Sequence, residues 1–164
     1  MHSEGHAGLT LLIMSLIMIP FGANENALYL IVLSAAFSAL PDLDMKWRTQ
    51  ISFIQHRGIT HSILFALLSG VAFGALFFYT HRTITWVAIG FLSAFFGVVS
   101  HLIGDMFTHH AFKPLWPFYH NEVALHWFSA NNKAVNEGLF TAGGIVFIAY
   151  FLFVSGNLSS LLAS

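Results

Sequence analysis

Five apolar stretches separated by short polar segments constrain this chain more than any other feature of its sequence. They run from about Leu9 to Phe21, Ala27 to Leu40, Ser62 to Tyr79, Ile84 to Gly104 and Leu139 to Leu162. A helix needs about 20 residues to cross ~30 Å of hydrocarbon. The last three stretches meet or nearly meet that length, and the first two cross only where polar ends lie deep or the bilayer thins. The sequence therefore predicts an all-α integral membrane bundle with about five transmembrane helices.

Composition supports this fold class and excludes several functions. Only 8% of the 164 residues are charged, whereas a soluble domain carries about 25%. We interpret residues 1–164 as one membrane-embedded domain whose first partner is the lipid bilayer. With a net charge of -1, the chain has no basic stripe for a phosphate backbone, so nucleic acid is excluded as a partner. With no cysteine, a metal must be bound by His, Asp or Glu.

The distribution of positive charges predicts the orientation. If all five stretches cross, the N-terminus and the loops 41–60 and 108–138 lie on one side of the membrane. That side holds Lys46, Arg48, Arg57, Lys113 and Lys133, and the other side holds only Arg82. The positive-inside rule then puts the N-terminus in the cytoplasm of a multi-pass protein of the inner or plasma membrane. The N-terminal segment lacks the basic residues of a signal peptide and is interpreted as a helix.

The residues that can carry chemistry fall on this same side, although they come from four separate segments. His6 precedes the first stretch, Asp42 and Asp44 follow the second, His56, Arg57 and His61 precede the third, and His101 and Asp105 end the fourth. His101 and Asp105 are spaced i, i+4, so they share a helix face. Gly90, Ala94, Gly97 and Gly104 form a small-residue stripe with His101, which indicates a close helix approach and an inward-facing imidazole.

Imidazoles combined with carboxylates predict a divalent metal site holding one or two ions, with zinc favoured over manganese or iron. We expect His6, Asp42, His61, His101 and Asp105 to be ligands and His56 to be a further ligand or an orienting partner. Asp44 is the expected general base or a supporting group, and Arg57 is the expected clamp for an anionic substrate oxygen.

Five of these residues also have a purely structural interpretation. His6 can be an interfacial side chain, His61 a helix cap, His101 a packing histidine, and Asp42 and Asp44 an acidic turn after Pro41. Ionisable groups at membrane depth are expensive and mark function by default, so their joint convergence favours a site. His109, His110, His120 and His126 are interpreted as loop residues first and accessory ligands second, and His2 and His81 as solvent-exposed. The aromatic segment from Phe112 to Phe128 is interpreted as an interfacial flap or an ordinary aromatic belt.

These motifs resemble those of the YdjM-type membrane-bound, metal-dependent hydrolases of bacteria and archaea. The resemblance covers about residues 4 to 118 and lies in Glu4-Gly5-His6, Leu40-Pro41-Asp42-Leu43-Asp44, His56-Arg57-Gly58-Ile59-Thr60-His61-Ser62, the segment from Ser100 to Thr108, and Leu115-Trp116-Pro117. Ala111 departs from the pattern, which usually has a glycine there. The resemblance implies a metal-dependent hydrolase embedded in the membrane.

A fainter similarity links the order of ligands to zinc-dependent bacterial phospholipases C and the related single-strand nucleases. It implies one metal on Asp42, His56 or His61, His101 and Asp105, and a second on His6 and Asp105. We therefore expect hydrolysis of an ester or phosphoester, of a lipid or lipid-linked substrate, at the cytoplasmic membrane face. The alternative is a membrane protein without enzymatic activity, either a metal or proton carrier or an interaction scaffold.

Overall fold

The computed structural model describes residues 1–22, 24–43 and 58–154, with side chains described up to residue 152. These residues form helices connected by turns and one long loop, as predicted. The helices are α1 (Ser3–Met18), η1 (Ile19–Phe21), α2 (Glu25–Phe37), η2 (Ile59–His61), α4 (Ile63–His81), α5 (Ile84–Met106) and α6 (Lys133–Val154). The predicted site residues Asp44, His56 and Arg57 lie outside the described part of the chain.

Four of the helices are long and apolar enough to cross a membrane: Ser3–Phe21, Ile63–His81, Ile84–Met106 and Lys133–Leu152. The first begins several residues before the predicted stretch, so His6 lies inside α1 and does not precede it. The prediction failed there because a buried polar residue interrupts the apolar pattern without interrupting the helix. With 13 residues, α2 is the shorter apolar helix of the bundle.

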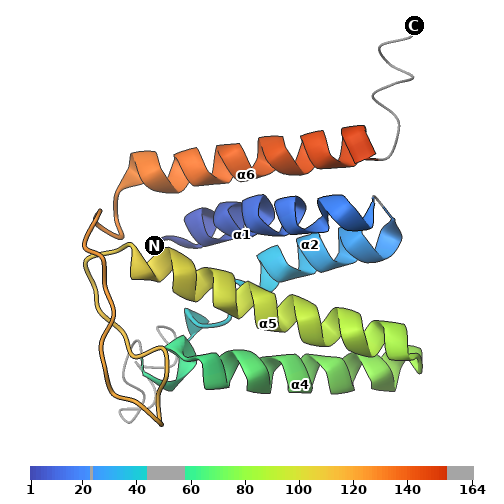
Figure 1. The fold of residues 1–164 in the computed structure, drawn as a ribbon, viewed down its shortest axis with the longest axis horizontal. Helices are drawn as coiled ribbons and strands as arrows, with labels where there is room; N and C mark the ends of the chain where they lie inside the picture. The colour runs from blue at the N-terminus through green and yellow to red at the C-terminus, as the bar shows by residue number, and fades with distance from the viewer. Residues whose placement is uncertain (23, 44–57, 155–164) are drawn as a thin grey trace, which may run out of the picture.

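The helices α1, α2, α4, α5 and α6 form one bundle in which direction alternates along the chain, so that the neighbours α1 and α6 run in the same direction, as do α2 and α5 (Figure 1). The N-terminus, the chain that follows α2, the beginning of α4, the end of α5 and the beginning of α6 lie at one end of the bundle, on the left of that view. We call this end the site end. The predicted grouping of the N-terminus with the second and fourth connections is therefore confirmed.

Local sequence explains where the helices begin and end. Asn24 caps α2, since its Oδ1 accepts a hydrogen bond from Ala27 N at 3.0 Å, and Ser62 caps α4 through Phe65 N at 3.2 Å. Arg82 adopts a left-handed conformation, with φ 58°, that ends α4. The short turn that follows makes α4 and α5 antiparallel neighbours.

Glycines allow the helices to approach closely, as the small-residue stripe on α5 predicts. A Cβ added to Gly97 would lie 2.6 Å from the carbonyl oxygen of Ser34 in α2, and one added to Gly90 would lie 2.5 Å from that of Phe73 in α4. A Cβ on Gly143 would meet the backbone of Gly8, so α1 and α6 also pack almost backbone to backbone.

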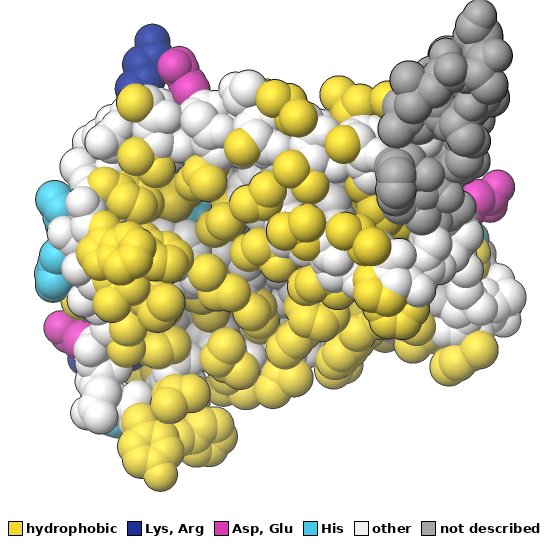
Figure 2. Space-filling model, turned by 45° about the horizontal axis from the view of Figure 1, so that its top comes forward, with side chains coloured by type: hydrophobic (Ala, Val, Ile, Leu, Met, Phe, Trp, Pro, Cys, Tyr) yellow, Lys and Arg dark blue, Asp and Glu magenta, His cyan; other side chains and the backbone are white. Residues whose placement is uncertain are grey.

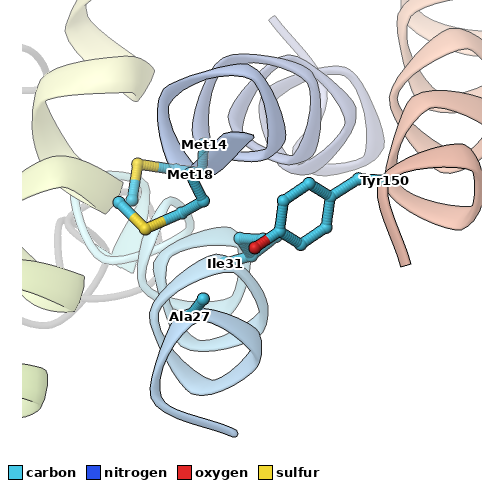
Figure 3. Packing of buried hydrophobic residues seen from close by; sticks show 5 residues of the cluster. All are labelled: Met14, Met18, Ala27, Ile31 and Tyr150. Carbon is cyan, nitrogen blue, oxygen red and sulfur yellow. The ribbon is translucent and has the colours of Figure 1, made fainter. Parts of the chain in front are cut away.

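Apolar residues fill the half of the bundle away from the site end. Met14 and Met18 of α1 pack with Ala27 and Ile31 of α2 and with Tyr150 of α6 (Figure 3). The Tyr150 hydroxyl donates to the Gly22 carbonyl at 2.9 Å, which satisfies its polar end. This cluster fixes the relative positions of the first, second and last helices, and the other half of α1 carries the polar residues described below.

The outer surface matches a lipid environment. Figure 2 shows hydrophobic side chains spread over the face between the two ends, with histidine, acidic and basic side chains gathered towards the ends. Many exposed side chains on the long helices are large and apolar, including Leu68, Val71 and Ile145. A surface of this kind is stable only against hydrocarbon.

The loop between α5 and α6 folds over the site end. Phe112 and Val123 exchange two backbone hydrogen bonds within it, and Ile63 N at the beginning of α4 donates to Pro114 O at 2.8 Å. Phe112, predicted as part of an interfacial flap, is buried beside Ala66 and Leu102, so that assignment was wrong for this residue. Phe118 remains exposed, as a flap or an aromatic belt requires.

Candidate metal centre

The structure brings five of the predicted ligands together at the site end. They are His6 of α1, Asp42 in the turn that follows α2, His61 of η2, and His101 and Asp105 of α5. His6, His61, His101 and Asp105 are each at most 1% exposed, and the side chain of Asp42 is 18% exposed. Segments separated by up to 99 positions in the sequence therefore supply one buried cluster, and Asp42 lies on its more accessible side.

Three donor atoms form a compact triangle in this cluster. Nε2 of His61 lies 3.3 Å from Nε2 of His101, and Oδ2 of Asp105 lies 3.4 Å and 3.7 Å from these two nitrogens. Oδ1 of Asp42 follows at 3.9 Å and 3.7 Å from the same two nitrogens. Ligands that lie about 2.0–2.2 Å from a tetrahedral zinc ion are roughly 3.3–3.6 Å apart. The triangle thus has nearly the dimensions of one face of a zinc coordination tetrahedron.

Backbone and hydroxyl groups orient two of the imidazoles. His101 Nδ1 lies 2.7 Å from the carbonyl oxygen of Ser38, so this nitrogen donates and Nε2 is left with its lone pair towards the cluster. His61 Nδ1 lies 3.1 Å from Thr60 Oγ1. Histidines that bind metals commonly have such a partner on the other ring nitrogen. Neither partner was predicted, because Ser38 contributes a backbone carbonyl and Thr60 was noted only as a member of the motif that contains His61.

His6 occupies a position beside the triangle. Its ring stacks on that of His101 with centroids 3.6 Å apart, and its Nε2 lies 3.4 Å from Asp105 Oδ1. Both ring nitrogens of His6 are buried; among the described residues Nδ1 has no hydrogen-bond partner, and Nε2 has none beyond this 3.4 Å contact with Asp105. A buried polar atom without a partner is costly, and a metal ligand is one role that removes this cost.

Gly104 makes room for this ring, because a Cβ at that position would lie 3.0 Å from His6 Nδ1. The stripe glycine therefore serves the cluster as well as helix packing.

Asp105 links the two parts of the cluster. Its Oδ2 faces His61 and His101, and its Oδ1 faces His6 and accepts a 2.7 Å hydrogen bond from the amino group of Met1. The cluster contains two groups of possible ligands that share His101: one formed by His61, His101 and Asp105 and the other by His6, Asp42 and His101. The donor set fits zinc, manganese or iron, since it consists of imidazoles and carboxylates.

The remaining histidines of the described chain lie outside these two groups. His109, His110, His120 and His126 are all exposed in the loop between α5 and α6. His2 is exposed as predicted and lies near Glu4 and Asn131, while His81 stacks on Trp86 with centroids 4.0 Å apart. The loop histidines therefore remain loop residues in this structure, which was the first interpretation of them.

Comparison with known proteins adds a family to this geometry. The family model described as YdjM inner membrane protein matches residues 1–161. The match includes α6, beyond the residues 4–118 on which the resemblance was recognised. No curated protein and no solved structure matches the chain.

Proposed function

The chain belongs to the YdjM inner membrane protein family and is a multi-pass membrane protein, and from this premise we propose that it is a metal-dependent hydrolase. The proposed substrate is an ester or phosphoester of a lipid or a lipid-linked molecule. The observation that carries the proposal is the triangle of His61, His101 and Asp105, whose donor atoms lie 3.3–3.7 Å apart in a buried setting.

Three protein ligands with one open position are typical of catalytic zinc sites, whereas structural sites have four. His61, His101 and Asp105 would supply the three, and Asp42 lies on the accessible side, where substrate or water arrives. A bound divalent metal polarises a carbonyl or phosphoryl oxygen and lowers the pKa of a water to about 7. Asp42 would complete the donor set or hold that water, and His6 would bind a second ion together with Asp105.

Burial strengthens the electrostatic interactions among these residues. A carboxylate and three imidazoles that are at most 1% exposed interact more strongly than in water, because the local dielectric constant is low. The Ser38 carbonyl holds the His101 ring in the tautomer that points Nε2 inward. Arg57 and Asp44 lie outside the described residues; we propose them from the sequence as the anion clamp and as the general base or a supporting group, respectively.

A second candidate function is transport of a metal ion or proton, and the buried polar interior is the observation that favours it. Thr10, one turn after His6, and Ser100, next to His101, share a hydrogen bond of 2.5 Å. Ser15, Ser34 and Ser93 have buried hydroxyl oxygens without partners among the described residues. Ser15 lies on α1, Ser34 on α2 and Ser93 on α5, so these buried polar groups come from three different helices.

The experiment that tests the hydrolase combines metal analysis with turnover. Detergent-purified protein reconstituted with zinc, manganese or iron should hold about one or two ions per chain and hydrolyse members of a panel of ester and phosphoester lipids. Replacing His101 or Asp105 by Ala should abolish both properties. A protein without metal above background, or full turnover in both variants, contradicts the proposal. Zinc or proton uptake into proteoliposomes, without turnover on any lipid, identifies the carrier instead.

A further inference from the structure

An apolar groove begins beside the metal centre and continues along α4. Its volume is about 330 Å³, and it is lined by Leu40, Leu43, Thr60, Phe65, Leu68, Ser69, Ala72 and Phe73. None of these side chains is charged, and the two hydroxyl groups belong to Thr60 and Ser69. The lining therefore suits a hydrocarbon and offers no counter-charge to a polar ligand.

The site end of the groove is made by neighbours of the ligands. Leu40 and Leu43 lie on either side of Asp42 in the chain, and Thr60 Oγ1 is 3.1 Å from Nδ1 of His61. A molecule in the groove therefore has one end next to two residues of the proposed metal centre.

The groove runs from that end along one face of a membrane-spanning helix. Phe65, Leu68, Ser69, Ala72 and Phe73 recur at the three- and four-residue spacing of a single helix face. They cover about 12 Å of the axis of α4, at 1.5 Å per residue. Because α4 begins at the site end, the groove extends from the centre towards the middle of the bilayer.

The neighbouring surface of α4 shows what surrounds the groove. Leu67, Leu68 and Val71 are 44%, 55% and 61% exposed, in a helix whose length and hydropathy suit a membrane span. Hydrocarbon chains of lipids are the medium in contact with such a surface. The groove is thus continuous with the lipid-facing surface and can be filled sideways from the bilayer.

We propose that this groove binds one hydrocarbon chain of the substrate and so places the bond attached to that chain at Asp42 and His61. This inference rests on the proposed function and adds that the substrate is an amphiphile entering from within the membrane. A volume of about 330 Å³ lies at the lower end of the ~300–1,000 Å³ typical of ligand sites, which favours a single chain as the occupant.

The test uses two matched substitutions on α4. Ala72→Trp fills the groove, whereas Ala75→Trp places the same side chain three residues further along the helix, outside the groove lining. Both alanines are exposed, so neither substitution overpacks the helix bundle. The full-length, zinc-reconstituted protein is used in phosphatidylcholine vesicles.

The first measurement is photolabelling with lysophosphatidylcholine that carries a diazirine at the end of its acyl chain. Labelling by surrounding lipid increases linearly with probe, whereas labelling of a bound chain saturates. We expect saturable labelling on α4 in the wild type and in Ala75→Trp, and its loss in Ala72→Trp. Saturable labelling that is unchanged in Ala72→Trp overturns the inference. The absence of saturable labelling in the wild type overturns it as well.

The second measurement is the ratio of kcat/KM for p-nitrophenyl octanoate to that for p-nitrophenyl acetate. Each methylene that loses its apolar contact costs roughly fourfold, so loss of two or more lowers this ratio by at least about tenfold in Ala72→Trp. A ratio equal to that of Ala75→Trp overturns the inference. The two proposals fail separately: a protein that hydrolyses neither ester but loses saturable labelling in Ala72→Trp has the chain site without the proposed hydrolase activity.

Discussion

Replacing Asp105 by Asn should uncouple metal binding from folding. Asn keeps the size of the side chain but removes the negative charge, and Oδ2 of Asp105 lies 3.4 Å and 3.7 Å from the two imidazole nitrogens of the triangle. Loss of a partner one shell further out typically costs 10–100-fold in metal affinity. Because Asp105 would bind the metal directly, we expect Asp105→Asn to lower the zinc affinity at least about 100-fold, which corresponds to roughly 2.7 kcal/mol.

The size of the effect on stability follows from binding linkage. Zinc at about 100 times its Kd stabilises the folded protein by ~2.7 kcal/mol. After a 100-fold loss of affinity, the same zinc concentration equals the new Kd and contributes only ~0.4 kcal/mol. For a chain of this size, about 1 kcal/mol changes Tm by ~2–4 °C. The rise in Tm on adding zinc should therefore fall from about 5–11 °C in the wild type to about 1–2 °C in Asp105→Asn.

The assay is thermal unfolding of the detergent-solubilised protein with and without zinc, supported by elemental analysis of the same samples. Ser100→Ala is the control, since Ser100 is buried on α5 beside His101 but hydrogen-bonds to Thr10 and the Gly97 carbonyl. It should lower the free energy of unfolding by about 0.5–1.5 kcal/mol, which lowers Tm in both conditions, and it should keep the full zinc-dependent rise in Tm. A wild-type rise in Asp105→Asn would refute the assignment of Asp105 as a ligand, whatever the Tm of the metal-free protein.

Three further predictions test other parts of the site and the topology. Gly104→Ala should displace His6, because the new Cβ would lie 3.0 Å from its Nδ1. It should therefore weaken metal binding more than the control Gly144→Ala, whose Cβ meets no neighbour within 4 Å. Equal zinc affinities of the two variants in a zinc titration would contradict the role of His6. Asp44→Asn should lower turnover by ~10²–10⁴-fold while metal content stays constant, as expected of a general base, and a parallel loss of metal would make Asp44 a ligand. A reporter inserted near Lys46 should give a cytoplasmic signal, and one fused after Ser164 an external signal. Two signals from the same side would disprove an odd number of crossings between these two positions.

Much of the fold could be predicted because it depends on properties that are local in the sequence. Apolar stretches of near-membrane length predict helices, since backbone groups in hydrocarbon must be satisfied within the segment. Helix boundaries were less accurate: α1 begins at Ser3, because the polar residues around His6 conceal a helix that buries them against other helices. The spacing of His101 and Asp105 predicted one shared face, and both side chains lie in the cluster.

The contacts between segments depended on tertiary structure. Nothing local in the sequence predicts that His6 stacks on His101, that the Ser38 carbonyl fixes the His101 tautomer, or that Phe112 turns inward. The same holds for the groove, whose wall joins residues near the end of α2 to one face of α4.

The sequence by itself therefore determined the membrane location, the helical class and the residue types available for a metal. Only the tertiary structure decided which donor atoms meet, at 3.3–3.7 Å in the triangle of His61, His101 and Asp105. The physical reason is that hydropathy and helical periodicity act over a few neighbouring residues, whereas these distances depend on how closely whole helices approach. That approach is set by glycines such as Gly97 and Gly104, at which any side chain would meet a neighbouring segment.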